Sequence, residues 1–571
     1  MYDSYYNWNQ GYAYVVQNSN HWVYAGTGFS EGDAVPGIVG YEWDRQFNNG
    51  FTPAGLVTLS NSPVKNVSNV SSFANSSIYQ ATSGAWVFNA GTVYWTFGCD
   101  FNPFQTRNLV DSRIQQTTKN ILNKFVTSNG TNPPGNTAYT YNLPLVTNQA
   151  HTALGQTTTF VTFQNLSGSA TANISVQYYG VSDGVPGPNN SLTIPAKGQQ
   201  AILPNIPLGS NFGGVITSDQ PLNLVVSENY NSGGSAYNIS AQTAAILYSP
   251  LALNGQYGFV TSIVVFNAAS TGNATGTLRF FDENGNLASA ATQNFNLPAH
   301  ASQTFNQAAA GSGLTFSHTY WAEIIADSSS ASLTAQVIEF GPANFVATFN
   351  ALMPSQVANT LYAPACFNGQ FNFVTGMALA NPNNSPANVA INYFDANGAL
   401  LKTQTFQIPA NGVNGVFQPN VVGLSNAVNS AIVNSTQPLI MLVNEGGPGA
   451  VAGTYVGLTS GSTNVALPVM SNGYAGFVTG TTVLNIASRT AHLTFTYLNQ
   501  AGNQVGFLQS KTLAPNASFL VYQGDATQGL PDGFFGTALI NSDQPILVTT
   551  NALNTATGVF YSYTEPSTLT G

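Results

Sequence analysis

The sequence predicts a mainly β protein, in which tandem antiparallel β-sandwich repeats follow a small mixed α/β segment. Three observations predict this fold class. A set of landmarks recurs about every 105 residues, apolar and polar residues alternate within each recurrence, and glycine-containing turns separate the alternating runs. The period exceeds the roughly 20–50 residues of solenoid repeats, so each recurrence is expected to be a sandwich domain of its own.

The landmarks of the repeats are prolines and one short motif. Each repeat opens with a proline after an apolar or small residue, at spacings of 106, 114 and 104 residues, and a second proline marks its middle. A late Gln-Pro-Leu or Gln-Pro-Ile motif is present in all repeats except the second. The opening prolines are Pro144, Pro250, Pro364 and Pro468, the middle ones are Pro195, Pro298, Pro409 and Pro515, and the late motif lies at 218–222, 435–439 and 542–546. We therefore predict four repeats, at 137–245, 246–358, 359–463 and 464–571.

Strands and turns are readable within a repeat. Runs rich in Val, Ile, Thr and Tyr alternate with period two at 159–163, 172–178, 390–394 and 493–497, as half-buried strands do. The turns at 282–285, 395–398 and 499–502 end in glycine, which fits a type I turn followed by a left-handed residue. About seven short strands per repeat are typical of an Ig-like or jelly-roll-like sandwich.

The first 128 residues differ in composition. They hold five of the six tryptophans and six of the eleven basic residues. The stretch 111–125 predicts a helix with Asp111 as its N-cap and with Ile114, Ile121, Leu122 and Phe125 on one face. The stretch 85–95 predicts one or two strands, and Pro-Pro-Gly-Asn at 133–136 predicts a linker.

A resemblance rests on four features of this first segment. They are 26–28 (Gly-Thr-Gly), 40–44 (Gly-Tyr-Glu-Trp-Asp), the stretch 79–92 and the helix of 113–125. In this order they resemble the C-terminal domain of the N,N-dimethylformamidase beta (large) subunit family, over about residues 10–127. The resemblance implies the end of an amidotransferase-like α/β domain, which in that family supports amide hydrolysis at an iron site held by tyrosines and a glutamate. Glu42 and Asp44 match a motif of the domain, but no iron ligand is assigned to a position of this sequence.

The repeats carry a looser resemblance, which rests on the Gln-Pro-Leu and Val-Asn-Glu pattern at 437–445. They are similar to sandwich modules found in tandem on secreted and surface proteins of environmental bacteria. This resemblance implies an extracellular or cell-surface location.

Charge is scarce, and this excludes some classes of function. Asp, Glu, Lys and Arg make up 6% of the 571 residues, against about 25% in ordinary soluble domains. Eleven basic against 21 acidic residues exclude a nucleic-acid binder that works through phosphate contacts and a polybasic membrane-surface module. No run of about 18 apolar residues is present, so no membrane span is expected.

The first 40 residues contain neither Lys nor Arg and no apolar signal core. We therefore expect a mature or truncated product of an exported protein, with an intracellular chain as the alternative. Cys99 and Cys366 are 267 residues apart and are expected to be two free buried thiols rather than a disulfide.

Candidates for chemistry are few, and no catalytic, cofactor or metal residue is predicted. The five histidines are dispersed, and two distant cysteines exclude a zinc signature. Asp282 and Asp395 begin Asp-x-Asn-Gly runs, which fit hairpin turns better than calcium loops because the later carboxylates are missing. Ser83 lacks the glycines of a nucleophile elbow, and sequons such as the one at Asn66 leave glycosylation open. The histidines are His21, His151, His300, His318 and His492.

One carboxylate recurs after the same apolar strand, as Glu228, Glu339 and Glu445, while the last repeat has Asn551 or Ala552 there. The recurrence predicts a carboxylate that accepts backbone N–H bonds at a loop. A weak cation site is the alternative.

Five basic residues are too few to protect the edges of four sandwiches by charge. Those edges must be covered by bulges, prolines and neighbouring repeats, or used in assembly. We therefore expect a non-enzymatic extracellular structural protein that binds copies of itself in a filament, sheath or surface layer. An aromatic stretch at 2–14 is a candidate interface strand. The alternatives are an adhesin that binds glycans or the cell envelope through exposed aromatics, expected only in the first segment, and a remnant of an amidohydrolase.

Overall fold

The computed structural model describes residues 2–4, 11–40, 42–47, 50, 52–53, 55–66, 68–81, 86–101, 108–127, 139–152, 155–230, 233–239, 241–309, 311–342, 345–424, 427–447, 452–554, 556–557 and 559–564. The chain forms two compact units, unit 1 (residues 1–137) and unit 2 (residues 138–571), and each is considered separately. Strands dominate the described residues, which confirms the mainly β class. The predicted linker and Ser83 lie outside the described residues, as do Tyr5, Tyr6 and Trp8 of the aromatic stretch.

Unit 1 combines short strands with two helices around one core. Trp43, Tyr14, Ile38 and Ile114 are buried in that core. Because Tyr14 is a core residue, it is not available for contacts with other copies, and this part of the interface expectation is wrong. The elements are β1 (Tyr2–Ser4), β2 (Tyr12–Val15), β3 (Ala34–Val39), β4 (Glu42–Asp44), β5 (Val57–Thr58), β6 (Ser62–Lys65), β7 (Ser71–Ala74), β8 (Ser77–Gln80), β9 (Trp86–Asn89), α1 (Trp95–Cys99) and α2 (Ser112–Thr127).

Helix α2 follows the sequence expectation at its start but not along its whole face. The Asp111 carboxylate accepts a bond from the Arg113 backbone N–H (2.8 Å), as an N-cap does. Ile114 and Ile121 are buried, whereas Leu122 (55% exposed) and Phe125 (36% exposed) are not. The buried stripe instead continues through Thr117, whose hydroxyl bonds to the carbonyl of Arg113 one turn back. The predicted apolar face was therefore too wide.

The stretch 85–95 contains one strand, β9. Gly91 follows it in a left-handed turn (φ +68°), where a Cβ atom would lie 2.1 Å from the Asn75 carbonyl oxygen. Trp95 begins α1 instead of ending a second strand. No described helix is both long and apolar enough to cross a membrane.

Unit 2 consists of four successive sheet systems, which we call modules 1 to 4. Module 1 holds β10 (Tyr139–Thr152), β11 (Gly155–Asn165), β12 (Ala172–Gly180), β13 (Pro186–Ile194), β14 (Gln199–Ile202), β15 (Ser210–Ser218), β16 (Leu222–Tyr230) and β17 (Gly233–Asn238). Module 2 holds β18 (Ile246–Gln256), β19 (Phe259–Asn267), β20 (Ala274–Asp282), β21 (Gln293–Leu297), β22 (Ser302–Asn306), β23 (Thr319–Ala326), β24 (Leu333–Phe340) and β25 (Val346–Asn350). Module 3 holds β26 (Ala358–Phe367), β27 (Val374–Ala380), β28 (Ala387–Phe394), β29 (Leu400–Ile408), β30 (Val413–Phe417), β31 (Val428–Gly446) and β32 (Ala452–Val456). Module 4 holds β33 (Ser462–Tyr474), β34 (Phe477–Asn485), β35 (Ala491–Asn499), β36 (Gln504–Leu513), β37 (Ser518–Tyr522), β38 (Phe534–Asn554) and β39 (Val559–Thr564).

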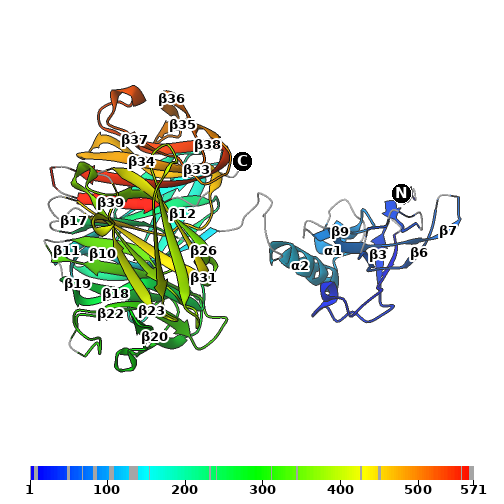
Figure 1. Ribbon diagram of the computed structural model, residues 1–571. Helices are drawn as coiled ribbons and strands as arrows, with labels where there is room; N and C mark the ends of the chain where they lie inside the picture. Colours follow the sequence, from blue (N-terminus) through cyan, green and yellow to red (C-terminus); the bar gives the residue numbers. More distant parts are fainter. Residues whose placement is uncertain are drawn as a thin grey trace. The chain divides into compact units, whose positions relative to one another are not determined.

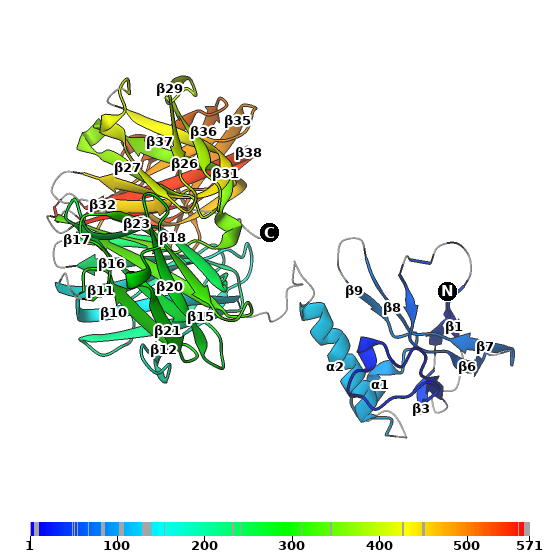
Figure 2. The same cartoon turned by 60° about the horizontal axis from the view of Figure 1, so that its bottom comes forward.

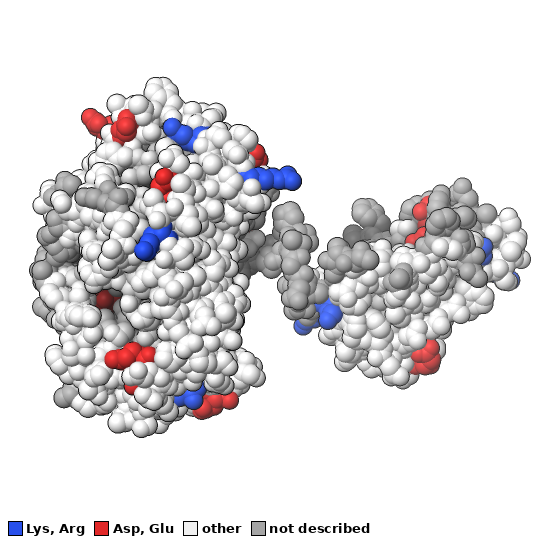
Figure 3. Space-filling model, in the orientation of Figure 1, with Lys and Arg blue, Asp and Glu red and all other residues white. Residues whose placement is uncertain are grey.

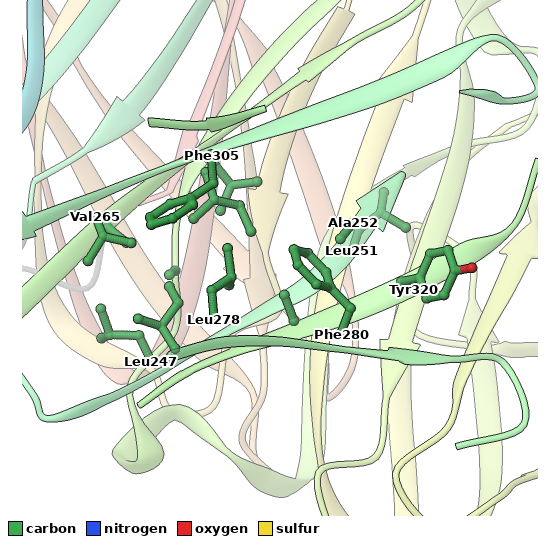
Figure 4. Packing of buried hydrophobic residues seen from close by; sticks show 14 of the residues in the cluster. Leu247, Leu251, Ala252, Val265, Leu278, Phe280, Phe305 and Tyr320 are labelled. Atoms are coloured by element: carbon green, nitrogen blue, oxygen red, sulfur yellow. The ribbon is translucent and has the colours of Figure 1, made fainter. Parts of the chain in front are cut away.

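Each module is an antiparallel sandwich. In module 2 the order β21-β20-β23-β18 forms one sheet and β22-β19-β24-β25 forms the other. Leu278 and Phe280 from the first sheet pack against Val265 and Phe305 from the second (Figure 4). In module 3 the single long strand β31 runs through both sheets, and β38 does so in module 4. Each of them corresponds to two successive strands of the other modules, β15 and β16 in module 1 and β23 and β24 in module 2. The Gln-Pro motif lies where the chain passes from one sheet to the other.

The proline landmarks have structural roles. Each opening proline lies at a register shift of the first strand, where a residue without an N–H is tolerated. The middle prolines belong to a turn that contains a left-handed residue, for example His300 (φ 59°) after Pro298. A buried asparagine at the end of the second strand bonds to this turn. In module 2 the Asn267 amide donates to the carbonyls of Gly272, Leu297 and Pro298 at 3.0–3.2 Å, and Asn165, Asn381 and Asn485 do the same in the other modules.

The four modules close into a ring. In each module the glycine of the hairpin between its third and fourth strands lies against the middle-proline turn of the next module, and module 4 contacts module 1 in this way. A Cβ atom would lie 1.9–2.3 Å from a carbonyl oxygen of that turn at all four glycines, so only glycine fits. The pairs are Gly184 with Ala299, Gly285 with Ala410, Gly398 with Pro515 and Gly502 with Ala196.

The last strands of the modules meet at the centre of the ring. Strand β17 lies against β25 and β39, and β32 lies against the same two strands. In Figures 1 and 2 the red end of the chain lies beside the cyan-green strands of module 1. The Thr564 backbone N–H donates to Asn238 Oδ1 (3.1 Å), which joins the last described residue to module 1. We call these four strands the hub and the boundary between two modules a seam.

Candidate functional sites

Glu42 and Asp44 flank the buried Trp43 on β4. Asp44 Oδ2 accepts a bond from the side chain of Asn89 (2.9 Å), and the Asp44 backbone N–H donates to the carbonyl of Gly91 (3.0 Å). The strand is thus fastened to the turn after β9. The arrangement gives Asp44 a structural role.

Two buried tyrosines form the polar centre of unit 1. The hydroxyl of Tyr14 lies 2.7 Å from both Tyr24 Oη and Ser76 Oγ, and Tyr24 donates to the carbonyl of Leu59 (2.6 Å). Burial raises the pKa of both tyrosines above the usual value of a phenol. They are therefore neutral hydrogen-bonding groups of the core.

The histidines are dispersed, as predicted. No group of three or more His, Cys, Asp and Glu side chains is placed to hold a metal ion within the part of the chain that the structure describes. The side chain of His151 lies outside the described residues. His21 accepts a bond from the Val23 N–H (3.5 Å), and the His300 ring stacks on Tyr179 (4.2 Å between centroids). His318 lies 3.1 Å from Glu283, and His492 lies 2.8 Å from Asp543.

Asp282 and Asp395 stabilise hairpin turns, as predicted. Asp282 Oδ1 accepts bonds from the N–H groups of Asn284 (2.9 Å) and Asn286 (2.8 Å), and Asp395 does the same in module 3. Both cysteines are free thiols, as expected, although Cys99 is only half-buried while Cys366 is buried.

The recurring glutamates are not at loops. Glu228, Glu339 and Glu445 lie within strands, opposite Thr159, Thr261 and Thr375 of the neighbouring strand, and each is at most 2% exposed. In module 4 the residue opposite Thr479 is Ala552, which identifies the equivalent position. The expected bonds from backbone N–H groups are absent among the described residues, and for Glu228 and Glu339 side chains of the next module donate instead. The prediction of a loop carboxylate was wrong because sequence periodicity does not show which strands face another module.

At the seam between modules 1 and 2, Glu228 is fully bonded. Its Oε1 accepts from Gln336 Nε2 (2.8 Å), and its Oε2 accepts from the hydroxyls of Thr348 and Tyr230 (3.0 Å each). Gln336 and Thr348 belong to module 2. These bonds offset part of the free energy lost when the carboxyl leaves water.

The two following seams have fewer donors. At the seam of modules 2 and 3, Glu339 Oε2 accepts from Asn444 Nδ2 (2.7 Å). At the seam of modules 3 and 4, Glu445 faces Asn551 and Ser562. Neither oxygen of the Glu445 carboxyl completes a hydrogen bond with a described residue.

Burial dominates the electrostatics of all three glutamates. It raises the pKa of Glu228, that of Glu339 to about 7 and that of Glu445 to about 8. A protonated carboxyl is neutral and also donates a bond, which suits a carboxyl whose two oxygens complete no bond with a described residue. Near neutral pH, Glu445 is therefore mainly protonated.

The fourth seam, which closes the ring, lacks a carboxyl. Ala552 replaces the glutamate, and Ala236 stands where modules 2, 3 and 4 have Thr348, Thr454 and Ser562. Both alanines line one cavity of about 420 Å³ between modules 4 and 1. This seam therefore differs in chemistry from the other three.

The hub also borders an open cavity of about 540 Å³, where its four strands end. Asn238, Asn350, Val456 and Thr564 line it, one from each module. None of its described lining residues is charged. A charged ligand would lose its hydration there without a counter-charge.

Exposed aromatic side chains are found on unit 2, contrary to the expectation that only the first segment has them. Tyr257 (82% exposed) and Phe316 (70% exposed) lie at one end of module 2, where the Phe316 ring covers Gly255. Tyr257 also has a left-handed backbone (φ 53°), which is unusual for a bulky residue. By contrast, all described tryptophans of unit 1 are buried or half-buried. The sequence signal for Tyr257 was the hairpin motif at 254–261, which does not include Phe316.

Comparisons with known proteins add one family. Residues 1–108 match the family model of the C-terminal part of N,N-dimethylformamidase beta subunit-like proteins, which confirms the resemblance for this part of the chain and ends before α2. No curated protein matches. Among solved structures, a protein of Thermotoga maritima described as 1070 is similar at 15% identity, with a TM-score of 0.17, over 19% of this chain and 98% of its own. The family match thus applies to the first 108 residues, and unit 2 is described by its fold alone.

Proposed function

We propose that the chain is an extracellular structural protein that assembles with copies of itself through the outer strands of unit 2. The observation that carries the proposal is a ring that uses its inner strands within the chain, while the outer edges of β29 and β36 pair with no other described strand. On the face shown in Figure 3, charged side chains of unit 2 are few and scattered. Weak charge offers little opposition to contacts between copies.

Two outer strands carry the apolar groups for such contacts. Among the described strands, β29 pairs only with β28, and β36 pairs only with β35; Figure 2 labels both at one end of unit 2. Leu401 in β29 and Phe507 and Leu508 in β36 are exposed and lie at register shifts of these pairs. Each strand has a single lysine, Lys402 or Lys511, so both edges have little protection by charge.

The test is assembly of the full chain at rising concentration, followed by sedimentation velocity and electron microscopy. We expect ordered fibres or sheets from the wild type and their loss in the double variant Leu401→Lys/Phe507→Lys. The matched control is Thr271→Lys/Ser289→Lys, which adds the same charge at exposed positions of module 2. A wild type that remains monomeric, or a control that loses assembly equally, contradicts the proposal.

A second candidate function is binding of neutral glycans, which the Tyr257 and Phe316 pair favours. Flat exposed rings beside amide and hydroxyl groups suit a sugar face, and Gln256 and Ser317 bond to each other beside them (3.0 Å). We expect retention of the full chain on cellulose or chitin, and loss of retention in Tyr257→Ala and Phe316→Ala. Phe507→Ala is the control, since it removes an exposed ring elsewhere. Equal retention of all variants contradicts this function.

We also propose that unit 1 has no amidase activity in this chain, although the family it matches is a hydrolase family. Asp44 is bonded to Asn89 (2.9 Å), and no group of three or more His, Cys, Asp and Glu side chains among the described residues is placed to hold a metal ion. The assay is release of dimethylamine from N,N-dimethylformamide by the full chain, with and without added Fe(II). Turnover that is lost in Glu42→Gln contradicts the proposal.

A further inference from the structure

The closing seam between modules 4 and 1 contains a built cavity. Its floor is formed by Val225, Ala236 and Ala552, each at most 2% exposed. Leu203 (47% exposed) and Tyr474 (50% exposed) also line it, which places the mouth beside them. The cavity of about 420 Å³ falls within the usual range of small-molecule pockets, about 300–1,000 Å³.

The cavity exists because module 1 presents smaller side chains than module 2 does at the equivalent face. Strand register equates Ser227 with Ile338 and Asn229 with Phe340. In module 2, Ile338 and Phe340 are buried in an apolar cluster that fills the seam with module 1. Ser227 and Asn229 are instead half-buried and line the open space.

The loss of the seam carboxyl enlarges the same space. Where the first seam has Glu228 bonded to Thr348, the closing seam has Ala552 and Ala236. Both substitutions remove side-chain volume and polar atoms from the floor. The floor is therefore apolar, whereas the equivalent position at the first seam is hydrogen-bonded.

The walls are aromatic and preformed. Phe477 stacks on Tyr561 (5.0 Å between centroids, 14° between planes), and Tyr474 stacks on Phe535 (4.7 Å, 16°). The Tyr561 hydroxyl donates to Asn229 Oδ1 across the seam, which fixes that ring. Rings held in this way lose little conformational entropy when a ligand binds.

The polar groups of the cavity are all neutral. Thr162, Ser227 and Gln500 supply hydroxyl and amide groups, and no described lining residue is charged. An ionised ligand would lose its hydration without a partner charge. The lining therefore selects a neutral ligand with a flat apolar part and one or two hydrogen-bonding groups.

We propose that the closing seam is a binding site for a small neutral molecule that carries an aromatic or similar flat ring and a hydroxyl or amide group. The ring lies between the aromatic walls above the Ala236 and Ala552 floor, and the polar group meets Thr162, Ser227 or Gln500. This site is independent of the outer strands β29 and β36.

The test uses the full chain and the neutral fluorescent probe N-phenyl-1-naphthylamine. We expect saturable binding with one site per chain, and a Kd at least tenfold higher in Ala552→Met, which fills the floor. Tyr474→Ala removes an exposed part of the wall and is also expected to raise the Kd at least tenfold without a change in the core. Thermal unfolding followed by circular dichroism shows that both variants are folded.

The controls decide between this site and non-specific adsorption. Ala290→Met places the same side chain at an exposed position of module 2 and should leave the Kd unchanged. The assembly variant Leu401→Lys/Phe507→Lys should also bind normally, which separates this site from the proposed function. The anionic analogue 1-anilinonaphthalene-8-sulfonate should bind at least tenfold more weakly. No saturable binding in the wild type, equal binding in Ala552→Met, or equal binding of the anionic probe would overturn the proposal.

Discussion

At the scale of single residues, the buried polar groups of unit 2 define its construction. Asn267 is 1% exposed and its amide bonds to three carbonyls, while its Oδ1 accepts from the Ala269 N–H (3.1 Å). One side chain thus fixes two turns of module 2. In modules 1 to 3 the carbonyl of the middle proline accepts one of these bonds, and in module 4 the carbonyl of Ala514, which precedes Pro515, takes its place.

Loss of this amide should be costly. We expect Asn267→Ala to lower the free energy of unfolding by about 2–4 kcal/mol, because several buried carbonyls lose their donor. Urea unfolding is the measurement. Asn273→Ala, an exposed amide of the same module, should cost less than about 0.5 kcal/mol. Equal losses in the two variants would show that burial of the bonds is not what matters.

The seam glutamates make stability depend on pH. Burial raises the folded-state pKa of Glu339 to about 7 and that of Glu445 to about 8, so these two groups bind more protons in the folded protein than in the unfolded chain between about pH 4.5 and pH 8. Their contribution is therefore most favourable below the unfolded pKa, decreases as the pH rises through this window, and is constant above about pH 8. Glu445→Gln removes one titrating group while it keeps the side-chain size.

We expect Glu445→Gln to be more stable than the wild type at pH 9, by on the order of 4 kcal/mol, and to differ little from it at pH 4. Chemical denaturation at a series of pH values measures the difference. The surface variant Asp532→Asn is the control, because Asp532 lies at an exposed position of module 4. A difference that is independent of pH would rule out titration of Glu445 as the cause.

At the scale of elements, the hairpin glycines allow both a left-handed turn and the close contact with the next module that closes the ring. Gly398 has φ +84°, and a Cβ atom there would lie 2.2 Å from the Pro515 carbonyl oxygen of module 4. Gly423 has φ +94° but no neighbouring atom within 4 Å of such a Cβ. An alanine at position 423 therefore introduces backbone strain alone, whereas an alanine at position 398 introduces backbone strain and also a clash at the seam.

We expect Gly423→Ala to cost about 1 kcal/mol and Gly398→Ala at least 2 kcal/mol more, because the second substitution also pushes modules 3 and 4 apart. Equilibrium unfolding of the full chain measures both. Similar losses would mean that the hairpin does not transmit strain to the seam.

The elements were largely predictable from sequence, while their partners were not. Alternation at 159–163 and 493–497 predicted strands because a strand with one buried face repeats every two residues. Asp282 and Gly285 predicted a turn because their conformations are set locally. Glu228 looked like a loop residue because its donors, Gln336 and Thr348, are more than 100 residues away. The closing cavity was equally hidden, since it depends on residues of modules 1 and 4 that meet only in the ring.

At the scale of the whole molecule, the ring makes the four modules interdependent. Each module shares two seams and one hub strand with others, so none keeps all its buried groups satisfied alone. Four tandem sandwiches on a string would behave as independent units, but this arrangement does not allow that.

We expect unit 2 of the full chain to unfold in a single calorimetric transition, with a ratio of van't Hoff to calorimetric enthalpy near one. Differential scanning calorimetry is the measurement, and unit 1 contributes a separate transition. A ratio of about one quarter for unit 2 would indicate four independent modules and contradict the role assigned to the seams.

Ring closure also sets an order of events during biosynthesis. The bond between Tyr561 and Asn229 spans 332 residues, so module 1 is complete long before its second neighbour exists. At about 5–20 residues per second, a ribosome needs roughly 20–60 s to make the intervening chain. Throughout that interval, Ala236 and its surroundings remain open to water and to other nascent chains. A folding helper that shields this face, or export of the chain before it folds, would therefore have its greatest effect on the first module made.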